Sequence, residues 1–271
     1  METKQGKKAE KKSRGISAGV VIVVCGIIAA LFFNLWLGNP DNFAGGDTGG
    51  APLNYWGTVY HGGFVVCIVI TLMLTVFTLS IERYFAIGKA KGKGNLIKFV
   101  SDVKAKLDIN DVEGAQSLCS KQKGSVASVV SAGLRKYAEV AKLDDDTTKD
   151  QKLLAIQKEI EEATALEMPT MEQNLPVIAT ISSLGTLFGL LGTVLGMIRS
   201  FQAMGNEGAP DSVQLATGIS EALVNTALGI ATGALAIISY AFFTGKIDNI
   251  TYAIDETGFS IVQTYGEKHS K

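Results

Sequence analysis

Residues 174–240 read NLPVIATISSLGTLFGLLGTVLGMIRSFQAMGNEGAPDSVQLATGISEALVNTALGIATGALAIISY, an apolar hairpin around which the rest of the chain is arranged. Its two limbs, residues 177–198 and 222–243, contain no charged side chain. Each limb is long enough to cross a bilayer, which takes about 20 predominantly apolar residues in a helix. The stretch therefore predicts a pair of transmembrane helices.

Both limbs carry small and polar residues at intervals of three or four. In lipid the hydrophobic effect does not hold helices together, so small residues that let backbones approach closely are typical of helix interfaces. The first limb contains Ser182, Ser183, Gly185, Thr186, Gly189, Gly192, Thr193 and Gly196, and the second limb with its preceding turn contains Thr217, Glu221, Asn225, Thr226, Gly229, Thr232 and Gly233. We expect the two helices to pack closely and to share a polar seam.

Glu221 is the residue of this hairpin whose chemistry most strongly indicates a function. A carboxylic acid near the centre of a membrane helix costs about 2.5–3.5 kcal/mol on insertion scales, so it should face protein or water. A hairpin that turns near Gly208 places Thr193, Glu221 and Thr226 at similar depth, because each helical residue rises about 1.5 Å. A protonatable group beside hydroxyl groups is what a proton path requires. Two blander interpretations stay open: the hydroxyls serve only helix association, or Glu221 lies at the outer membrane interface.

Two further apolar runs, residues 16–37 and 63–81, bring the number of candidate membrane spans to four. A cleaved signal peptide competes for the first run, but the run is long and no A-x-A-like cleavage site follows it, so we expect a retained helix. Lys and Arg are absent from residues 38–62 and from the connector near Gly208. By the positive-inside rule these two loops lie outside and both termini lie inside.

These patterns predict an all-α polytopic membrane protein with long helices extending into the cytoplasm. The expected segments are a basic cytoplasmic tail (1–15), a transmembrane helix (16–37), an outer loop (38–62), a second transmembrane helix (63–85), a cytoplasmic helical region (86–175), a third transmembrane helix (176–204), an outer turn (205–212), a fourth transmembrane helix (213–245) and a cytoplasmic C-terminal helix (246–271). Within the cytoplasmic region, Leu96, Val100, Val103 and Leu107 recur at helical spacing and predict an amphipathic helix. Pro169 and Pro176 indicate an adjustment or a break where this region meets the membrane.

Composition excludes several classes of function. The net charge of −1 provides no basic field for nucleic acid. Three single cysteines, Cys25, Cys67 and Cys119, have the spacing of neither a zinc site nor a disulfide framework. The two histidines lie outside the apolar runs, and no residue resembles a nucleophile paired with its base. We therefore predict no enzyme, no catalytic residue, no metal and no cofactor.

Arg199, near the outer end of the third span, either extends to the interface or pairs with an acid.

The sequence also resembles a known family. GLLGTVLGMIRSF at 189–201 and GISEALVNTALGI at 218–230 look like the two signature stretches of the ExbB/TolQ/MotA proton-channel family, and are closest to its ExbB members. IERYFAI at 81–87 and VEGAQSLCSKQKGSVASVVSAGL at 112–134 extend the resemblance to roughly residues 63–265. The two long gapless motifs occur in the family's order and spacing, which makes the resemblance specific.

The resemblance implies a non-enzymatic motor subunit in the inner membrane of a Gram-negative bacterium, with periplasmic outer loops. ExbB-like proteins assemble as a ring, understood as a pentamer, around the transmembrane helix of an ExbD-like partner. Proton flow past an aspartate of that partner energises a TonB-like protein for outer-membrane uptake. TolQ-like envelope maintenance and a gliding or flagellar stator are alternatives within the family. A structural membrane scaffold is the alternative from another class, whereas a solute transporter lacks support because no inverted repeat is visible.

The family's site residues transfer to this chain one by one. Thr193 and Thr226 would face the central pore, and Glu221 would act in proton conduction or in assembly of the pore. Asn225, Thr186 and Gly189 would lie beside the pore. Asn225 stands where relatives usually have alanine, and the helix at 16–37 is extra to the family's three-helix core.

Overall fold

The computed structural model describes residues 17–142, 148–206 and 212–268. The described residues are helical along most of their length, without a β-strand, and contain a single isolated bridge between Phe43 and Pro52. Four stretches are long and apolar enough to cross a membrane: Ala18–Leu37, Phe64–Asp108, Lys149–Gln202 and Leu215–Lys268. The predicted all-α class with four spans is thereby confirmed. The predicted basic tail and residues 207–211 of the predicted turn lie outside the described residues.

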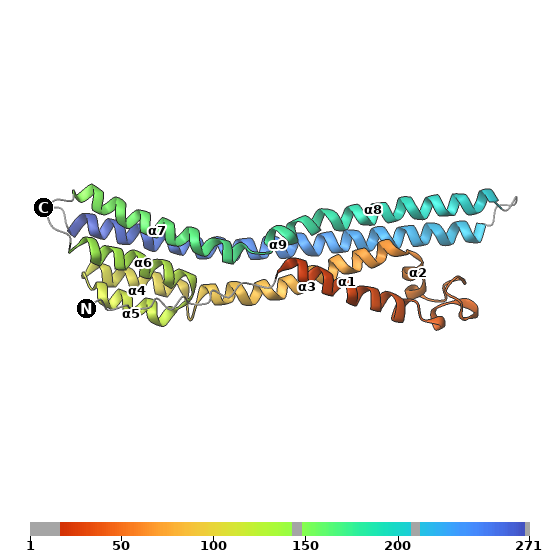
Figure 1. The fold of residues 1–271 in the computed structure, drawn as a ribbon, viewed down its shortest axis with the longest axis horizontal. Helices are drawn as coiled ribbons and strands as arrows, with labels where there is room; N and C mark the ends of the chain where they lie inside the picture. The colour runs from red at the N-terminus through yellow and green to blue at the C-terminus, as the bar shows by residue number, and fades with distance from the viewer. Residues whose placement is uncertain (1–16, 143–147, 207–211, 269–271) are drawn as a thin grey trace, which may run out of the picture.

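Figure 1 shows an elongated bundle with two ends, and we call the end that carries residues 38–63 the outer end. The helices are α1 (Ala18–Phe32), continued by the π-helical turn η1 (Phe33–Leu37), α2 (Tyr55–His61), α3 (Phe64–Lys91), α4 (Leu96–Asp108), α5 (Val112–Gln122), α6 (Gly124–Val140), α7 (Lys149–Glu172), α8 (Leu175–Asn206) and α9 (Ser212–Lys268). Two short 3-10 turns, η2 (Pro40–Asn42) and η3 (Ala44–Gly46), precede α2. The outer part consists of α1, α3, α8 and the first half of α9, and the inner part of α4–α7 and the second half of α9 (Figure 1).

The extra N-terminal helix packs along α3. The Cys25 sulfur on α1 lies 3.7 Å from the Thr78 hydroxyl oxygen on α3. A Cβ on the next residue, Gly26, would contact the Thr71 methyl group of α3 at 3.7 Å. Most of the other apolar side chains of α1 are exposed, so this helix presents a wide apolar surface.

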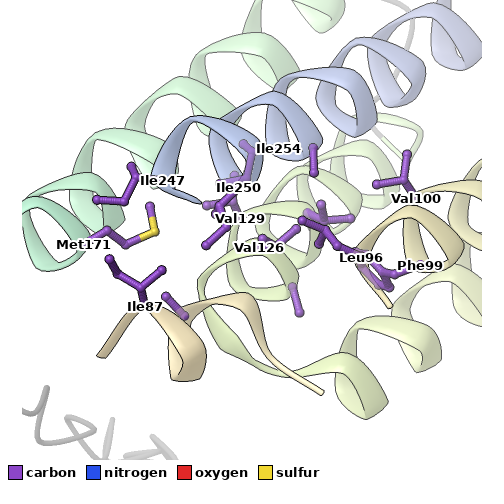
Figure 2. Packing of buried hydrophobic residues seen from close by; sticks show 14 of the residues in the cluster. Ile87, Leu96, Phe99, Val100, Val126, Val129, Met171, Ile247, Ile250 and Ile254 are labelled. Carbon is purple, nitrogen blue, oxygen red and sulfur yellow. The ribbon is translucent and has the colours of Figure 1, made fainter. Parts of the chain in front are cut away.

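The inner part owes its structure to amphipathic helices around α9. Leu96, Val100, Val103 and Leu107 of α4 are all buried, as their spacing predicts. In Figure 2, Leu96 and Val100 belong to one hydrophobic cluster with Ile250 of α9 and with residues of α3, α6 and α7. Burial of such side chains contributes about 1.5–3 kcal/mol each, so the inner part has a conventional hydrophobic core.

A break separates α7 from α8 at residues 173–174, between the two prolines that predicted it. Asn174 has φ +66°. The buried Arg83 guanidinium donates to the carbonyl oxygens of Thr170 at 3.2 Å and Met171 at 3.3 Å, which belong to the last turn of α7. A cation at a helix C-terminus offsets the negative end of the helix dipole. Glu82 pairs with Arg83 and accepts a hydrogen bond from Asn174 at 3.3 Å, so α3 clamps the break.

The outer loop is held by its own side chains. The Asn42 amide donates to the carbonyl oxygens of Trp36 and Leu37, both at 2.9 Å, and accepts from the Asn54 amide at 2.9 Å. Asn54 also caps α2 by accepting from the Gly57 N–H at 3.0 Å. These bonds fix the position of the short helix α2, whose C-terminal end packs on the first half of α9.

Candidate functional site

Glycine residues bring the backbones of α8 and α9 into direct contact. A Cβ on Gly189 would lie 3.0 Å from the Gly229 Cα, and a Cβ on Gly229 would lie 2.6 Å from the Gly189 Cα and from the Gly185 carbonyl oxygen. No side chain larger than hydrogen fits at such a distance without movement. The close helix pair predicted from the small residues is therefore present.

Thr193 and Thr226 meet in this seam. Their hydroxyl groups are hydrogen-bonded to each other across the two helices. Thr193 Oγ1 also lies 3.2 Å from the Gly189 carbonyl oxygen and 3.3 Å from that of Ala222, and Thr226 Oγ1 lies 3.3 Å from the Gly189 carbonyl oxygen. Because each hydroxyl has one hydrogen and several acceptors, the pair can exchange donor and acceptor roles. The predicted match in depth of these two residues is confirmed.

The half-buried Thr193 side chain borders a hollow on the surface of α8. The hollow has a volume of about 570 Å³ and is lined by Thr193, Val194, Met197, Ile198, Phe201 and Gln202. One side of the hydroxyl pair is thus open to the surroundings of the chain. The walls of the hollow are otherwise mainly apolar.

Glu221 has a partner that the sequence analysis did not identify. Its Oε1 lies 2.8 Å from Nδ1 of His61, the last residue of α2, and the two side chains are only 16% and 17% exposed. Glu221 directly precedes Ala222, whose carbonyl oxygen lies within reach of the Thr193 hydroxyl. Glu221 therefore lies less than two helical turns before Thr226 along α9, and its carboxyl group is covered by the outer loop.

Asn225 lies one helical turn after Glu221 and faces the same loop. Its side chain is 1% exposed, and its amide donates to the Gly62 carbonyl oxygen at 3.2 Å. A Cβ on Gly192 would lie 2.6 Å from the Asn225 Cβ, so the amide fills the junction of α2, α8 and α9. The Asn225 Oδ1 atom accepts no hydrogen bond from the described residues.

The remaining candidates divide between the seam and the surface. Thr186 lies in the seam like Gly189; its hydroxyl donates to the Ser182 carbonyl oxygen at 3.5 Å and would lie 2.8 Å from a Cβ on Gly233. Arg199 is exposed, and within the described part of the chain it forms no ion pair, so the interpretation in which it neutralises an acid gains no support. Among the described residues no group of three or more His, Cys, Asp or Glu side chains could hold a metal ion.

His61 was missed because no motif or periodicity surrounds it. The available signal was its place in the chain: it lies two residues before the apolar run at 63–81, while Glu221 directly precedes the run at 222–243. Both runs begin at the outer side under the positive-inside rule. The sequence therefore places two titratable groups at the same outer level, and the structure shows that they are neighbours.

A family model described as the MotA/TolQ/ExbB proton channel family matches residues 121–256, which include Thr193, Glu221 and Thr226. The chain belongs to this family. The membership agrees with the resemblance seen in the sequence and identifies a multi-pass membrane protein from a family of proton channels rather than enzymes.

Named relatives fall in two branches of the family. The chain is 31% identical over 182 residues to the putative biopolymer transport protein ExbB-like 3 of Synechocystis sp., covering 66% of this chain and 80% of the relative. It is 23% identical over 202 residues to a putative biopolymer transport protein ExbB homolog of Methanothermobacter thermautotrophicus, covering 73% of this chain and 67% of the relative. It is also 23% identical over 193 residues to the Tol-Pal system protein TolQ of Pseudomonas aeruginosa, covering 70% of this chain and 83% of TolQ.

Proposed function

We propose that this chain is the ExbB-like subunit of a motor driven by the proton-motive force. In this proposal it lies in the inner membrane of a Gram-negative bacterium with both termini in the cytoplasm. With an ExbD-like partner it energises a TonB-like protein for transport across the outer membrane. Family membership and the ExbB-named relatives support the proposal.

The observation that carries the proposal is the hydroxyl pair Thr193–Thr226 beside Glu221. Hydroxyl groups that can exchange donor and acceptor roles suit proton transfer, and a nearby carboxyl group can be charged and discharged. One proton crossing the membrane releases about 2.3 kcal/mol per 100 mV of potential, which can be coupled to motion. Glu221 is assigned to proton conduction, with Thr193 and Thr226 lining the path.

The proposed assembly is a ring, with five copies as the expected number, around the single membrane helix of the partner. The apolar hollow beside Thr193 supports contact with another helix there, because its walls are largely apolar and one hydroxyl faces it. Lys and Arg are absent from residues 38–62 and follow the second span at Lys89, Lys91 and Lys93, which supports the orientation.

Purification from the native membrane tests this assembly. A tag on the full-length chain is used to isolate the complex in mild detergent, and native mass spectrometry counts its subunits. We expect several copies of this chain together with a protein that has one membrane helix carrying an aspartate. Isolation of single chains without such a partner would contradict the proposal.

A TolQ-like role in envelope maintenance is the second candidate, favoured by the match that covers 83% of the Pseudomonas aeruginosa TolQ. The two roles differ in the phenotype of a deletion strain. Loss of receptor-dependent uptake with an intact envelope favours the ExbB-like role. Detergent sensitivity and leakage of periplasmic proteins with normal uptake favour the TolQ-like role.

A further inference from the structure

The outer loop holds the His61 ring in one orientation. The ring stacks on Phe43, with centroids 5.3 Å apart and an interplanar angle of 15°, and Phe43 itself is 2% exposed. His61 Nε2 lies 2.9 Å from the backbone carbonyl oxygen of Thr48, and Nδ1 lies 2.8 Å from Glu221 Oε1. Both nitrogen atoms of the ring are therefore engaged, and the ring is fixed by its partners.

These contacts determine which nitrogen exchanges a proton. The Thr48 carbonyl oxygen can only accept, so Nε2 carries a hydrogen. Nδ1 faces a carboxylate oxygen at hydrogen-bond distance, so one proton lies between Nδ1 and Oε1. The pair is then either imidazolium with carboxylate or neutral imidazole with carboxylic acid. In both states the exchangeable proton is on the line between His61 and Glu221.

We propose that His61 is the outer proton-relay residue of Glu221, so that the N-terminal segment before the family core supplies the outer end of the proton path. The inference rests on the proposed function, because it assigns the source of the proton that Glu221 passes on. His61 lies outside the residues that the family model matches.

The transfer balances in protons. In the ion-pair state the Nδ1 proton moves to Oε1, which leaves a neutral imidazole and a carboxylic acid. The carboxylic acid then releases its proton inward, which leaves a carboxylate beside the unprotonated Nδ1. The His61 ring is partly exposed, so a proton from water on the outer side can then bind to Nδ1, which restores the ion pair. Each cycle takes up one proton outside and releases one proton toward the threonine pair.

Other charged or titratable groups surround the pair without bonding to it. The Asp47 carboxylate accepts a backbone N–H of its own loop at 3.1 Å. The Tyr60 ring stacks on the aromatic ring of Phe33. The Arg199 guanidinium lies against the backbone between α2 and α3. Among the described residues none of these three groups forms an ion pair or a side-chain hydrogen bond with His61 or Glu221.

A purely structural role is the competing explanation. In that case His61 would only attach α2 to α9, a task to which the bond between the Asn225 amide and the Gly62 carbonyl oxygen already contributes. A glutamine at position 61 can donate a hydrogen bond to the carboxylate but cannot titrate. His61→Gln therefore separates attachment from proton transfer.

The test measures proton flux in liposomes that contain the complete complex, purified from the native membrane through a tag on this chain. Flux is driven by an imposed membrane potential while the bath pH is varied from about 5.5 to 7.5, the range in which histidine changes its charge. We expect His61→Gln to reduce flux by about tenfold or more, in line with the loss of a positioned acid–base group, and to flatten its dependence on bath pH. His269→Gln, at the chain's only other histidine, should behave like the wild type.

Chemical rescue provides a measurement that distinguishes proton transfer from a purely structural role of His61. In the His61→Gly variant, imidazole added to the bath should restore part of the flux, because the free base can occupy the vacated space. Reduced flux in His61→Gln without rescue of His61→Gly would overturn the relay.

The failures of the two proposals are distinguishable. Wild-type complexes that conduct protons, together with His61→Gln complexes that conduct equally well, would overturn the relay and leave the proposed function intact. Wild-type complexes that conduct no protons would overturn both.

If the position 61 variants do not assemble, the wild-type complex labelled with ¹⁵N-histidine is measured in the membrane, with His269→Gln to assign the signals. The relay predicts that Nε2 of His61 stays protonated over the same pH range and that only Nδ1 exchanges its proton. Loss of the Nε2 proton would overturn it.

Discussion

The hydroxyl group of Thr193 on α8 is hydrogen-bonded to the hydroxyl group of Thr226 on α9, and both lie within 3.3 Å of the Gly189 carbonyl oxygen. Two helices thereby place two exchangeable protons at one point of the seam. Ala222, the residue after Glu221, adds its carbonyl oxygen to the same cluster. This relationship connects the helix contact to the proposed proton path.

Substitutions at Thr193 should separate the effect of the hydroxyl group from the effect of side-chain size. Thr193→Ala removes the hydrogen bonding of one hydroxyl group to Thr226 and Ala222 of α9. An interhelical hydrogen bond is worth about 0.6 kcal/mol in membrane proteins, so the complex should assemble and conduct protons severalfold more slowly. Thr193→Leu fills the hollow with an apolar side chain and should abolish conduction. Flux in liposomes measures both. Thr180→Ala is the matched control, because Thr180 on α8 is exposed and bonds only within its own helix. Wild-type flux in Thr193→Leu would show that protons do not pass along the seam between α8 and α9.

Gly229 should tolerate no side chain. A Cβ at this position would lie 2.6 Å from the Gly189 Cα, so Gly229→Ala forces the helices apart at a cost of about 1–3 kcal/mol. We expect a clearly lower midpoint of thermal unfolding in detergent. Gly245→Ala on the same helix is the control, since no heavy atom lies within 4 Å of its Cβ position, and alanine stabilises a helix interior by about 0.5–1 kcal/mol. Equal midpoints for the two variants would contradict the close contact of α8 and α9.

Arg83 should be required for the junction between α7 and α8. The side chain is 1% exposed and pairs with Glu82 while it binds the last carbonyl groups of α7. Arg83→Met leaves these partners uncompensated, and removal of one partner of a buried pair costs about 3–5 kcal/mol. Lys158→Met, in an exposed pair with Glu162 at 3.7 Å, should cost about 0.2–1 kcal/mol. Denaturant unfolding in detergent compares the two, and similar losses would show that the clamp is unimportant.

Cys119 should resist thiol reagents in the folded protein. Burial raises the pKa of the Cys119 thiol to about 12, and only the thiolate reacts. The folded state holds this proton more tightly than the unfolded chain, whose cysteine pKa is about 8.5. This contribution to stability is therefore present below about pH 8.5 and is lost as the pH rises toward the folded value.

Maleimide labelling at about pH 8 checks the prediction in a variant that keeps Cys119 as its only cysteine. Labelling should occur only after unfolding. Ser120→Cys with Cys119→Ser is the control, because Ser120 is the exposed neighbour on the same helix. Rapid labelling of Cys119 in the folded protein would contradict the burial of α5 against its neighbours.

Much of the fold was predictable from residue patterns. Runs of about 20 apolar residues identify the membrane spans, and the spacing of Leu96, Val100 and Val103 predicts the buried face of α4. The small residues at intervals of three or four predicted the contact of α8 with α9. The similar distances of Thr193 and Thr226 from the turn of the hairpin predicted that the two residues lie at similar depth. These features are local, or they follow from a short hairpin, and therefore leave a periodic signal in the sequence.

The outer end of the site was not predictable in the same way. The loop that presents His61 has no periodicity, and its structure depends on individual side-chain bonds such as those of Asn42 and Asn54. The pair His61–Glu221 joins residues 160 positions apart. Likewise, two prolines indicated a break near the membrane, but its place at Asn174 depends on the clamp from Glu82 and Arg83. Such contacts become visible only when the helices are in place.

Proton flux through complexes that carry Glu221→Gln tests the proposed proton path most directly. Glutamine keeps the size and hydrogen-bonding ability of the side chain but cannot bind or release a proton. Glu256→Gln is the matched control, because Glu256 lies on the same helix, where it pairs with Lys104 at 2.6 Å in the inner part. We predict that Glu221→Gln complexes assemble with the normal number of subunits and conduct no protons, while Glu256→Gln complexes conduct like the wild type. Assembled Glu221→Gln complexes with wild-type flux would contradict the account.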